Sequence, residues 1–146
     1  MAAGLGSRYG GLKQIDEFGP SKEYLMDYAI FDAYRAGLRQ VTLIVRDSFL
    51  KEIQDMMLSK WRLYRDLNFS FVCQETTDVP PEFSGTDREK PWGTAHILYV
   101  LRKSMTSPFI IMNADDFYGR EALSSLALFL AKNPDKQAMV GYSLQK

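Results

Sequence analysis

Apolar runs of strand length alternate along this chain with segments in which apolar residues recur at helical spacing. Strands are predicted at the apolar, β-branched run 41–45, at 69–74, at 108–112 and at the terminal stretch 137–144. These strands do not read as alternating apolar and polar positions, which is typical of a sheet that is covered on both faces.

Helices are predicted between these strands from the spacing of apolar side chains and from residues that commonly cap helices. Ser21, Ser48 and Thr94 are expected N-caps, and Gly37 is a natural helix stop. The helices are expected over about 22–36, 49–57, 95–103 and 121–132. This order predicts an α/β fold, a three-layer sandwich with a mainly parallel, Rossmann-like doubly wound sheet.

The segment 75–91 interrupts the alternation. It contains Pro80, Pro81, Gly85 and Pro91 among seven charged residues and has no sustained period. Loops of this length without structure of their own are uncommon in compact domains. We interpret 75–91 as a long loop insertion, which is a lid, a dimer contact or a disordered segment.

The composition of the chain mainly excludes classes of protein and of site. The 146 residues carry 18 basic and 18 acidic side chains, so no bulk nucleic-acid-binding or membrane-binding surface is expected. The single cysteine, Cys73, excludes an internal disulfide and agrees with a reducing compartment. No apolar run approaches the roughly 18 residues of a membrane span, and no signal peptide follows Met1. We expect a cytoplasmic protein of one domain, for which a homo-oligomer stays open.

The first fourteen residues carry the strongest chemical signal. Four glycines lie within eight positions, namely Gly4, Gly6, Gly10 and Gly11. Because glycine has no Cβ, the backbone N–H groups of this stretch can approach and surround an anion. Arg8 can donate two hydrogen bonds to phosphate oxygens, and Lys13 adds a mobile positive charge. The stretch is interpreted as a polyphosphate-binding loop, and the alternative is a flexible glycine-rich N-terminus.

Two common phosphate-binding patterns do not fit this stretch. The dinucleotide pattern G-x-G-x-x-G would need a glycine where the chain has Tyr9. The Walker pattern needs Gly-Lys-Ser/Thr, whereas Lys13 lies between Leu12 and Gln14.

Two further groups are expected at the same edge of the sheet, since open α/β sheets bind ligands beyond the carboxyl ends of their strands. Asp115 and Asp116 follow the strand 108–112, and one or two carboxylates suffice to hold Mg²⁺ on substrate phosphates. Gln74 ends the strand 69–74, and its amide has the donor and the acceptor needed to read a nucleobase. The alternatives are a turn with a helix cap for the two acids, and a solvated strand end for the glutamine.

Three other chemically distinctive residues are interpreted more plainly. His96 is the only histidine, so it lacks the partners for a catalytic triad or a zinc site and is expected to be structural. Cys73 lies inside an apolar strand and is expected to be a small core residue. Trp92 either stacks on a base or covers the core.

The glycine-rich stretch resembles the signature of the nucleotidyltransferase superfamily, whose members join an NTP to a sugar phosphate or a similar acceptor. The match is the run 2–8, Ala-Ala-Gly-Leu-Gly-Ser-Arg, followed after a short gap by Lys13. The segment 113–119, Asn-Ala-Asp-Asp-Phe-Tyr-Gly, resembles the G-D-N-x-F/Y-x-G metal segment of that family. This likeness implies that Asp115 stands at the first acid of the metal segment.

The same resemblance implies a base pocket. Gln74 corresponds to a glutamine that reads the nucleobase, and Gly93 with Thr94 resembles the glycine that closes on the base ring. Nineteen residues separate Gln74 from Gly93, where many members of the family have a short gap.

The activity implied by the resemblance is Mg²⁺-dependent transfer of a nucleotidyl group from an NTP to a phosphorylated acceptor, with a sugar 1-phosphate preferred and pyrophosphate released. Arg8 would hold the leaving phosphates, Lys13 would contact the α-phosphate, and Asp115 would bind the metal. The nucleotide-binding residues would be Ala3, Gly4, Gly6, Ser7, Gln74, Gly93 and Thr94.

Two alternatives to this activity stay open. One is cytidylyl or guanylyl transfer to an alcohol phosphate or a cofactor, and the other is a non-catalytic nucleotide-binding or nucleotide-sensing domain. Members of the family carry a longer apolar strand before the equivalent alanines, and they supply a second metal-binding acid and the acceptor pocket from sequence further on. We therefore expect 1–146 to be a partial NTP-binding domain that is truncated at both ends and has an incomplete sheet.

Overall fold

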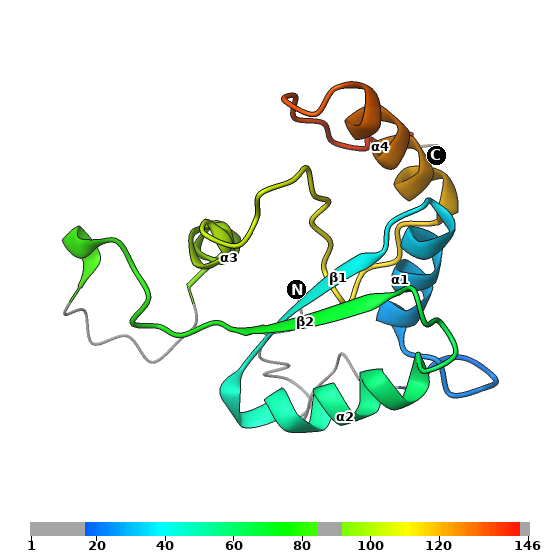
Figure 1. The fold of residues 1–146 in the computed structure, drawn as a ribbon, viewed down its shortest axis with the longest axis horizontal. Helices are drawn as coiled ribbons and strands as arrows, with labels where there is room; N and C mark the ends of the chain where they lie inside the picture. Colours follow the sequence, from blue (N-terminus) through cyan, green and yellow to red (C-terminus); the bar gives the residue numbers. More distant parts are fainter. Residues whose placement is uncertain (1–16, 85–91, 144–146) are drawn as a thin grey trace.

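A computed structural model describes residues 17–84 and 92–143 of the chain (Figure 1). Two parallel strands and four α-helices are found there, with two short 3₁₀ helices at Asp47–Phe49 and Pro81–Phe83. The strands are β1 (Gln40–Val45) and β2 (Asn68–Cys73), and the helices are α1 (Leu25–Arg35), α2 (Leu50–Lys60), α3 (Thr94–Leu101) and α4 (Arg120–Lys132). The predicted α/β class is confirmed. The glycine-rich stretch 1–14 and the part 85–91 of the long loop lie outside the described residues.

The centre of the fold is a β1–α2–β2 unit. Gln40 pairs with Asn68 and the parallel register continues to Val45 opposite Cys73, while α2 makes the crossover between the strands. Figure 1 shows α2 lying along the two strands. Parallel strands need a crossover of this kind because a tight turn cannot return the chain to the same end of the sheet.

Both faces of the two strands are covered by helices, as their continuous apolar sequences predict. Leu43 and Val45 belong to a buried cluster that they share with side chains of α1 and α2, namely Met26, Ile30, Ile53 and Met57. Ile44 points the other way and clusters with Ile97 and Leu101 of α3. Alternate residues of one strand therefore pack into different cores, which requires apolar side chains at consecutive positions.

The helices begin at residues other than the predicted caps. The N-cap of α1 is Tyr24 rather than Ser21, because the carboxylate of Asp27 accepts a hydrogen bond from the Tyr24 N–H at 2.8 Å. Ser48 lies within the 3₁₀ helix that precedes α2 and is not its cap. Thr94 is the first residue of α3, whose N-cap is Gly93.

The predicted strands at 108–112 and 137–144 are wrong within the described residues. The segments 108–112 and 137–143 run without regular secondary structure. A strand exists only when a neighbouring segment supplies N–H and C=O partners. In the described part of the chain the sheet has the order β1–β2 alone, and neither segment joins that ladder. Both segments are apolar in sequence, yet most of their side chains are exposed in the described structure.

No helix in the described part of the chain has the length and apolar character needed to cross a membrane.

Candidate functional site

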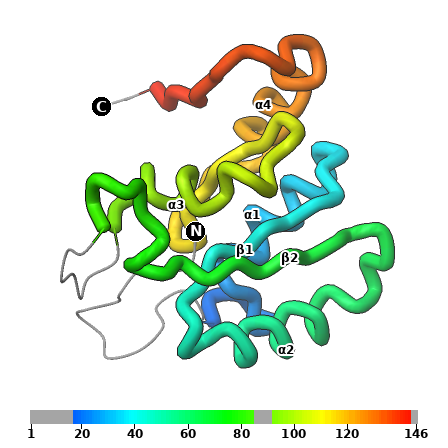
Figure 2. The backbone as a smooth tube through the Cα atoms, turned by 60° about the vertical axis from the view of Figure 1, so that its left-hand side comes forward, coloured from blue at the N-terminus to red at the C-terminus, as the bar shows by residue number. Residues whose placement is uncertain are grey.

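The carboxyl end of β2 carries the first group of candidate residues. The N–H of Gln74 donates to the carbonyl of Val45 at 3.0 Å, so the β1–β2 ladder continues one residue beyond the strand. This bond fixes the backbone from which the Gln74 side chain extends. Figure 2 shows α3 beside the carboxyl ends of the two strands.

The Gln74 side chain connects the two ends of the long loop. Its Nε2 donates to the backbone carbonyl of Trp92 at 3.2 Å and lies 3.0 Å from Nδ1 of His96. Gly93 and Thr94 follow immediately at the start of α3, where both are exposed. The loop excursion therefore returns to the strand end, and Gln74 and Gly93 are brought together despite their separation in sequence.

His96 is buried beneath this contact and serves local polar groups, in agreement with the structural role predicted for it. Its Nε2 lies 2.5 Å from the carbonyl oxygen of Asp78. A carbonyl oxygen can only accept, so the hydrogen must be on Nε2. In the neutral ring Nδ1 is then unprotonated and accepts from Gln74.

The first half of the long loop is held against α3. The indole Nε1 of Trp92 donates to the carbonyl of Thr76 at 2.9 Å, and Arg102 lies 3.5 Å from the Asp78 carboxylate. The Trp92 ring also contacts Phe83, with centroids 6.2 Å apart. These contacts attach the segment 75–84 to α3 and to Trp92.

Gly93 is exposed, has an ordinary backbone conformation and borders open space. Its φ of −68° is accessible to any residue, and a Cβ added there would meet no atom within 4 Å. Neither φ nor space therefore requires glycine here, although glycine is also a favoured N-cap residue and Gly93 caps α3. The bare backbone is compatible with a ligand that approaches it closely.

The second group of candidate residues is the turn at 113–118. Ala114 is buried in the cluster that contains Val45, the last residue of β1. The next residue, Asp115, is exposed, and its carboxylate makes no hydrogen bond or ion pair with any described residue. Asp116 differs, because its Oδ2 accepts from Asn113 Nδ2 at 2.8 Å and from the Tyr118 hydroxyl at 3.2 Å.

Tyr118 organises this turn, a role that the sequence reasoning missed. Its hydroxyl accepts from the Asn113 N–H at 2.8 Å while donating to Asp116. Burial raises the pKa of Tyr118 and the nearby Asp116 carboxylate raises it further, against the opposing effect of the Asn113 hydrogen bond. The hydroxyl therefore stays protonated and keeps its donor at neutral pH. The sequence signal was present in Asn113 and Tyr118, which flank the two acids.

The turn at 113–118 offers few donors to a metal ion. No group of three or more His, Cys, Asp or Glu side chains gathers within residues 17–84 and 92–143. Mg²⁺ on a substrate phosphate is commonly held by only one or two protein carboxylates. The exposed Asp115 fits such a site with one carboxylate, whereas Asp116 is engaged by its neighbours. The alternative for these acids was a turn and a helix cap. Asp116 stabilises the turn, but it does not cap the following helix, because the N-cap of α4 is Gly119.

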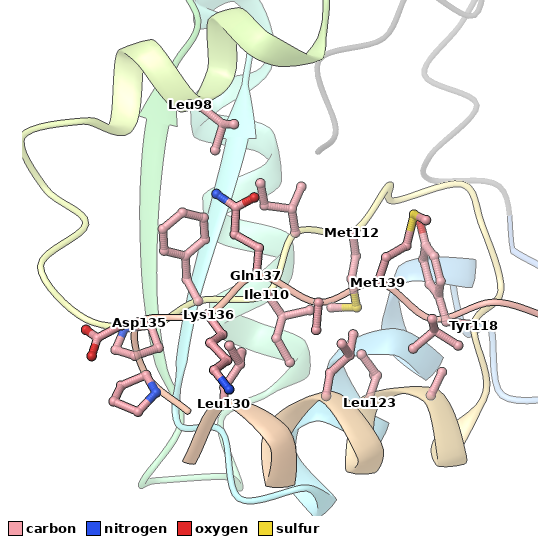
Figure 3. Close-up of a pocket in the computed structure, with 18 of the residues that line it drawn as sticks. Leu98, Ile110, Met112, Tyr118, Leu123, Leu130, Asp135, Lys136, Gln137 and Met139 are labelled. Carbon is pink, nitrogen blue, oxygen red and sulfur yellow. The ribbon is translucent and has the colours of Figure 1, made fainter. Parts of the chain in front are cut away.

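A cavity of about 600 Å³ lies elsewhere, between α4 and the extended segments 108–112 and 134–140 (Figure 3). Leu123 and Leu130 line it from α4, and Ile110 and Met112 line it from the facing segment. Asp135 and Lys136 are the only charged side chains among its described lining residues. An apolar lining of this kind suits no triphosphate, so we do not assign the nucleotide to this cavity.

The other predicted site residues lie outside the described residues. These are Ala3, Gly4, Gly6, Ser7, Arg8 and Lys13. Of the predicted residues that are described, Gln74, Gly93 and Thr94 meet at one place, while Asp115 lies on a separate turn. No hydrogen bond or ion pair joins that turn to the Gln74 group among the described side chains.

Comparison with known proteins gives no relative: no family model matches this chain, and neither does any curated protein.

Proposed function

We propose that this chain is the NTP-binding part of a Mg²⁺-dependent nucleotidyltransferase that acts on a phosphorylated acceptor, with a sugar 1-phosphate preferred. The observation that carries the proposal is the contact of Gln74 with the Trp92 carbonyl, which sets a polar amide beside the exposed Gly93 and Thr94. A base pocket needs these groups together, and they are distant in sequence.

The fold supports the proposal at a coarser level. The strands are parallel and helices pack on both of their faces, as in a doubly wound sheet. In our proposal the sheet is an incomplete, Rossmann-like three-layer sandwich. Gln74 follows the carboxyl end of β2, and Ala114 shares a buried cluster with the end of β1. Ligands of open α/β sheets bind at this edge.

The proposed chemistry is an in-line displacement, in which an acceptor phosphate oxygen attacks the α-phosphorus and pyrophosphate leaves. Arg8 holds the leaving phosphates together with the N–H groups of the glycine-rich loop, and Lys13 offsets the charge that grows on the α-phosphate. Such reactions depend on positioning and charge neutralisation more than on covalent participation by the protein. Both cations are assigned from the sequence resemblance.

Asp115 is the proposed metal ligand because it is the exposed acid of the 113–118 turn and has no described partner. Bound Mg²⁺ would neutralise charge on the phosphate oxygens. Asp116, through Asn113 and Tyr118, keeps the turn in the shape that presents Asp115.

Nucleotide binding is tested first and separately. Isothermal titration calorimetry of the 146-residue chain with ATP, GTP, CTP and UTP should show binding of at least one NTP, weakened when EDTA removes Mg²⁺. Gly93→Val should weaken that binding, because its side chain would occupy the open space that borders the exposed backbone of Gly93. If none of the four NTPs binds, the nucleotide proposal is wrong.

Transfer is tested by pyrophosphate release in the presence of sugar 1-phosphates. Lys13→Ala or Asp115→Asn should each lower turnover by about 10²–10³-fold, which is typical for loss of one charge-stabilising contact. Lys51→Ala and Asp55→Asn, exposed on α2, are the matched controls and should leave turnover unchanged. Full turnover by both site variants contradicts the mechanism. Mg²⁺-dependent binding without turnover in the wild-type chain favours the non-catalytic alternative.

A further inference from the structure

We propose that His96 is a positioning residue that makes Gln74 a hydrogen-bond acceptor for the bound base. Both amide hydrogens of Gln74 are engaged by the protein, so only the amide oxygen is left for a ligand. The ligand of this inference rests on the proposed function, whereas the side-chain arrangement stands on contacts within the chain.

The orientation of Gln74 follows from two carbonyl groups. The Trp92 carbonyl can only accept, so the atom of Gln74 that lies 3.2 Å from it is the amide nitrogen. The Asp78 carbonyl can only accept, so His96 carries its hydrogen on Nε2 and presents a bare Nδ1 to the same amide nitrogen at 3.0 Å. Each of the two amide hydrogens then has one acceptor.

The oxygen of the Gln74 amide accepts from no described residue. A glutamine with free donors and a free acceptor can pair with a base in either sense, and the base selects the orientation. Here the Trp92 carbonyl and His96 Nδ1 fix the orientation of the Gln74 amide before any ligand binds. Gln74 can pair only with an N–H group on the edge of a base, and an edge that offers only acceptors is repelled.

His96 is well placed to keep this orientation. Its side chain is buried, and its ring lies between those of Trp92 and Tyr99, with centroid distances of 6.2 and 6.5 Å. The ring therefore cannot turn over without disturbing its neighbours. Asp78, which supplies the carbonyl, is itself held to the end of α3 by Arg102.

The arrangement without ligand is tested by NMR. Because His96 is the only histidine, long-range ¹H–¹⁵N correlation of the chain reports its tautomer without assignment ambiguity. At neutral pH we expect hydrogen on Nε2 and a bare Nδ1, and two slowly exchanging Nε2 hydrogens on Gln74. A hydrogen on Nδ1 overturns the inference whether or not any nucleotide binds.

The effect on the ligand is tested by a double-mutant cycle on the dissociation constant of the NTP that binds most tightly. His96→Phe removes the acceptor and should weaken binding about fivefold to tenfold, the size expected for one hydrogen bond. In a Gln74→Met background the same change should have little effect, because the amide through which His96 acts is gone. Equal weakening in both backgrounds shows a merely structural role and overturns the inference.

Two further measurements complete the test. His96→Asn, whose carbonyl oxygen can replace Nδ1 as an acceptor, should restore at least part of the affinity that His96→Phe loses. The analogue of the same NTP that is methylated on its base N–H groups should bind the wild-type chain at least about tenfold more weakly, since its edge no longer donates. Equal affinity for the methylated analogue overturns the assignment of Gln74 as an acceptor. If no NTP binds, the proposed function fails, and the NMR result alone decides the side-chain arrangement.

Discussion

Asp27 shows how one buried charge can join the two helices that cover the same face of the sheet. Its carboxylate caps α1 through the Tyr24 N–H, accepts from the Trp61 indole at 3.2 Å and pairs with Lys60 of α2. The Lys60 ammonium also lies 3.7 Å from the centre of the Tyr24 ring. A buried carboxylate needs such a set of partners, because each group removed from water without one is costly.

Asp27→Ala should therefore destabilise the protein by about 2–4 kcal/mol, since it removes a helix cap, leaves the buried indole N–H without an acceptor and removes the carboxylate partner of the Lys60 ammonium, which keeps the Lys22 carbonyl. Urea denaturation measures the free energy of unfolding. Asp55→Ala, on the exposed face of α2, is the control and should change it by less than about 0.5 kcal/mol. A small effect for Asp27→Ala would show that water replaces these hydrogen bonds.

Residue-scale prediction from sequence worked where chemistry is local and failed where partners come from elsewhere. The lone His96 could be recognised as a residue without the partners for a catalytic triad or a zinc site, and it bonds local polar groups instead. Ser21 has the chemistry of an N-cap, yet Asp27 caps α1 because Lys60 and Trp61 hold its carboxylate there. Those two residues lie more than thirty positions away, so no local pattern contains them.

At the scale of elements, the end of α1 is set by Gly37. The Leu38 N–H donates to the Ala33 carbonyl and the Gly37 N–H donates to the Tyr34 carbonyl, both at 3.0 Å. These two hydrogen bonds end the helix. They require a left-handed backbone conformation at residue 37, where Gly37 has a φ of +94°. The sequence prediction of a helix stop at Gly37 is confirmed.

Gly37→Ala should lower the free energy of unfolding by about 1–2 kcal/mol, because alanine pays a steric penalty in the left-handed region. No atom lies within 4 Å of an added Cβ, so the effect isolates backbone conformation from packing. Gly141→Ala is the matched control: an added Cβ there also meets no atom within 4 Å, its φ is not in the left-handed region, and the melting temperature should not fall. Equal destabilisation by both variants would contradict the assignment to φ.

Two of the four predicted strands form and pair with each other, and the other two segments find no partner strand among the described residues. The sequences of 41–45 and 108–112 are similarly apolar, but only the first has a partner strand, reached through a short crossover helix. Sequence pattern reports burial, whereas a strand also needs a neighbour at the right register. The pattern cannot supply that neighbour.

At the scale of the molecule, the candidate site forms because the chain after the long loop comes back to the end of β2. No local sequence pattern predicts this contact. The residues 75–84 leave the sheet, and Asp78 contacts His96 of α3 while Thr76 and Phe83 contact Trp92, two residues before the helix. These contacts make the two ends of the excursion meet at Gln74. The resemblance implied that Gln74, Gly93 and Thr94 share one pocket, whereas the contacts that bring them together come from parts of the chain that no local pattern contains.

The paired strands and the two apolar segments without a partner strand should differ in local stability. The backbone amides of β1 that face β2 are bonded within the ladder, whereas the amides of 109–111 and 137–143 donate to no described backbone carbonyl. In hydrogen exchange, the amides of Val41, Leu43 and Val45, which face β2, should exchange about a hundredfold or more slowly than those of 109–111, because they open only with the sheet. The amides of α2 are the internal reference for a bonded element.

If 109–111 proves as protected as β1 at low protein concentration, a further segment of the same chain pairs with it. If the protection appears only as the concentration rises, a second copy supplies the partner strand, and the apolar cavity beside α4 is then part of a homo-oligomer rather than an open surface.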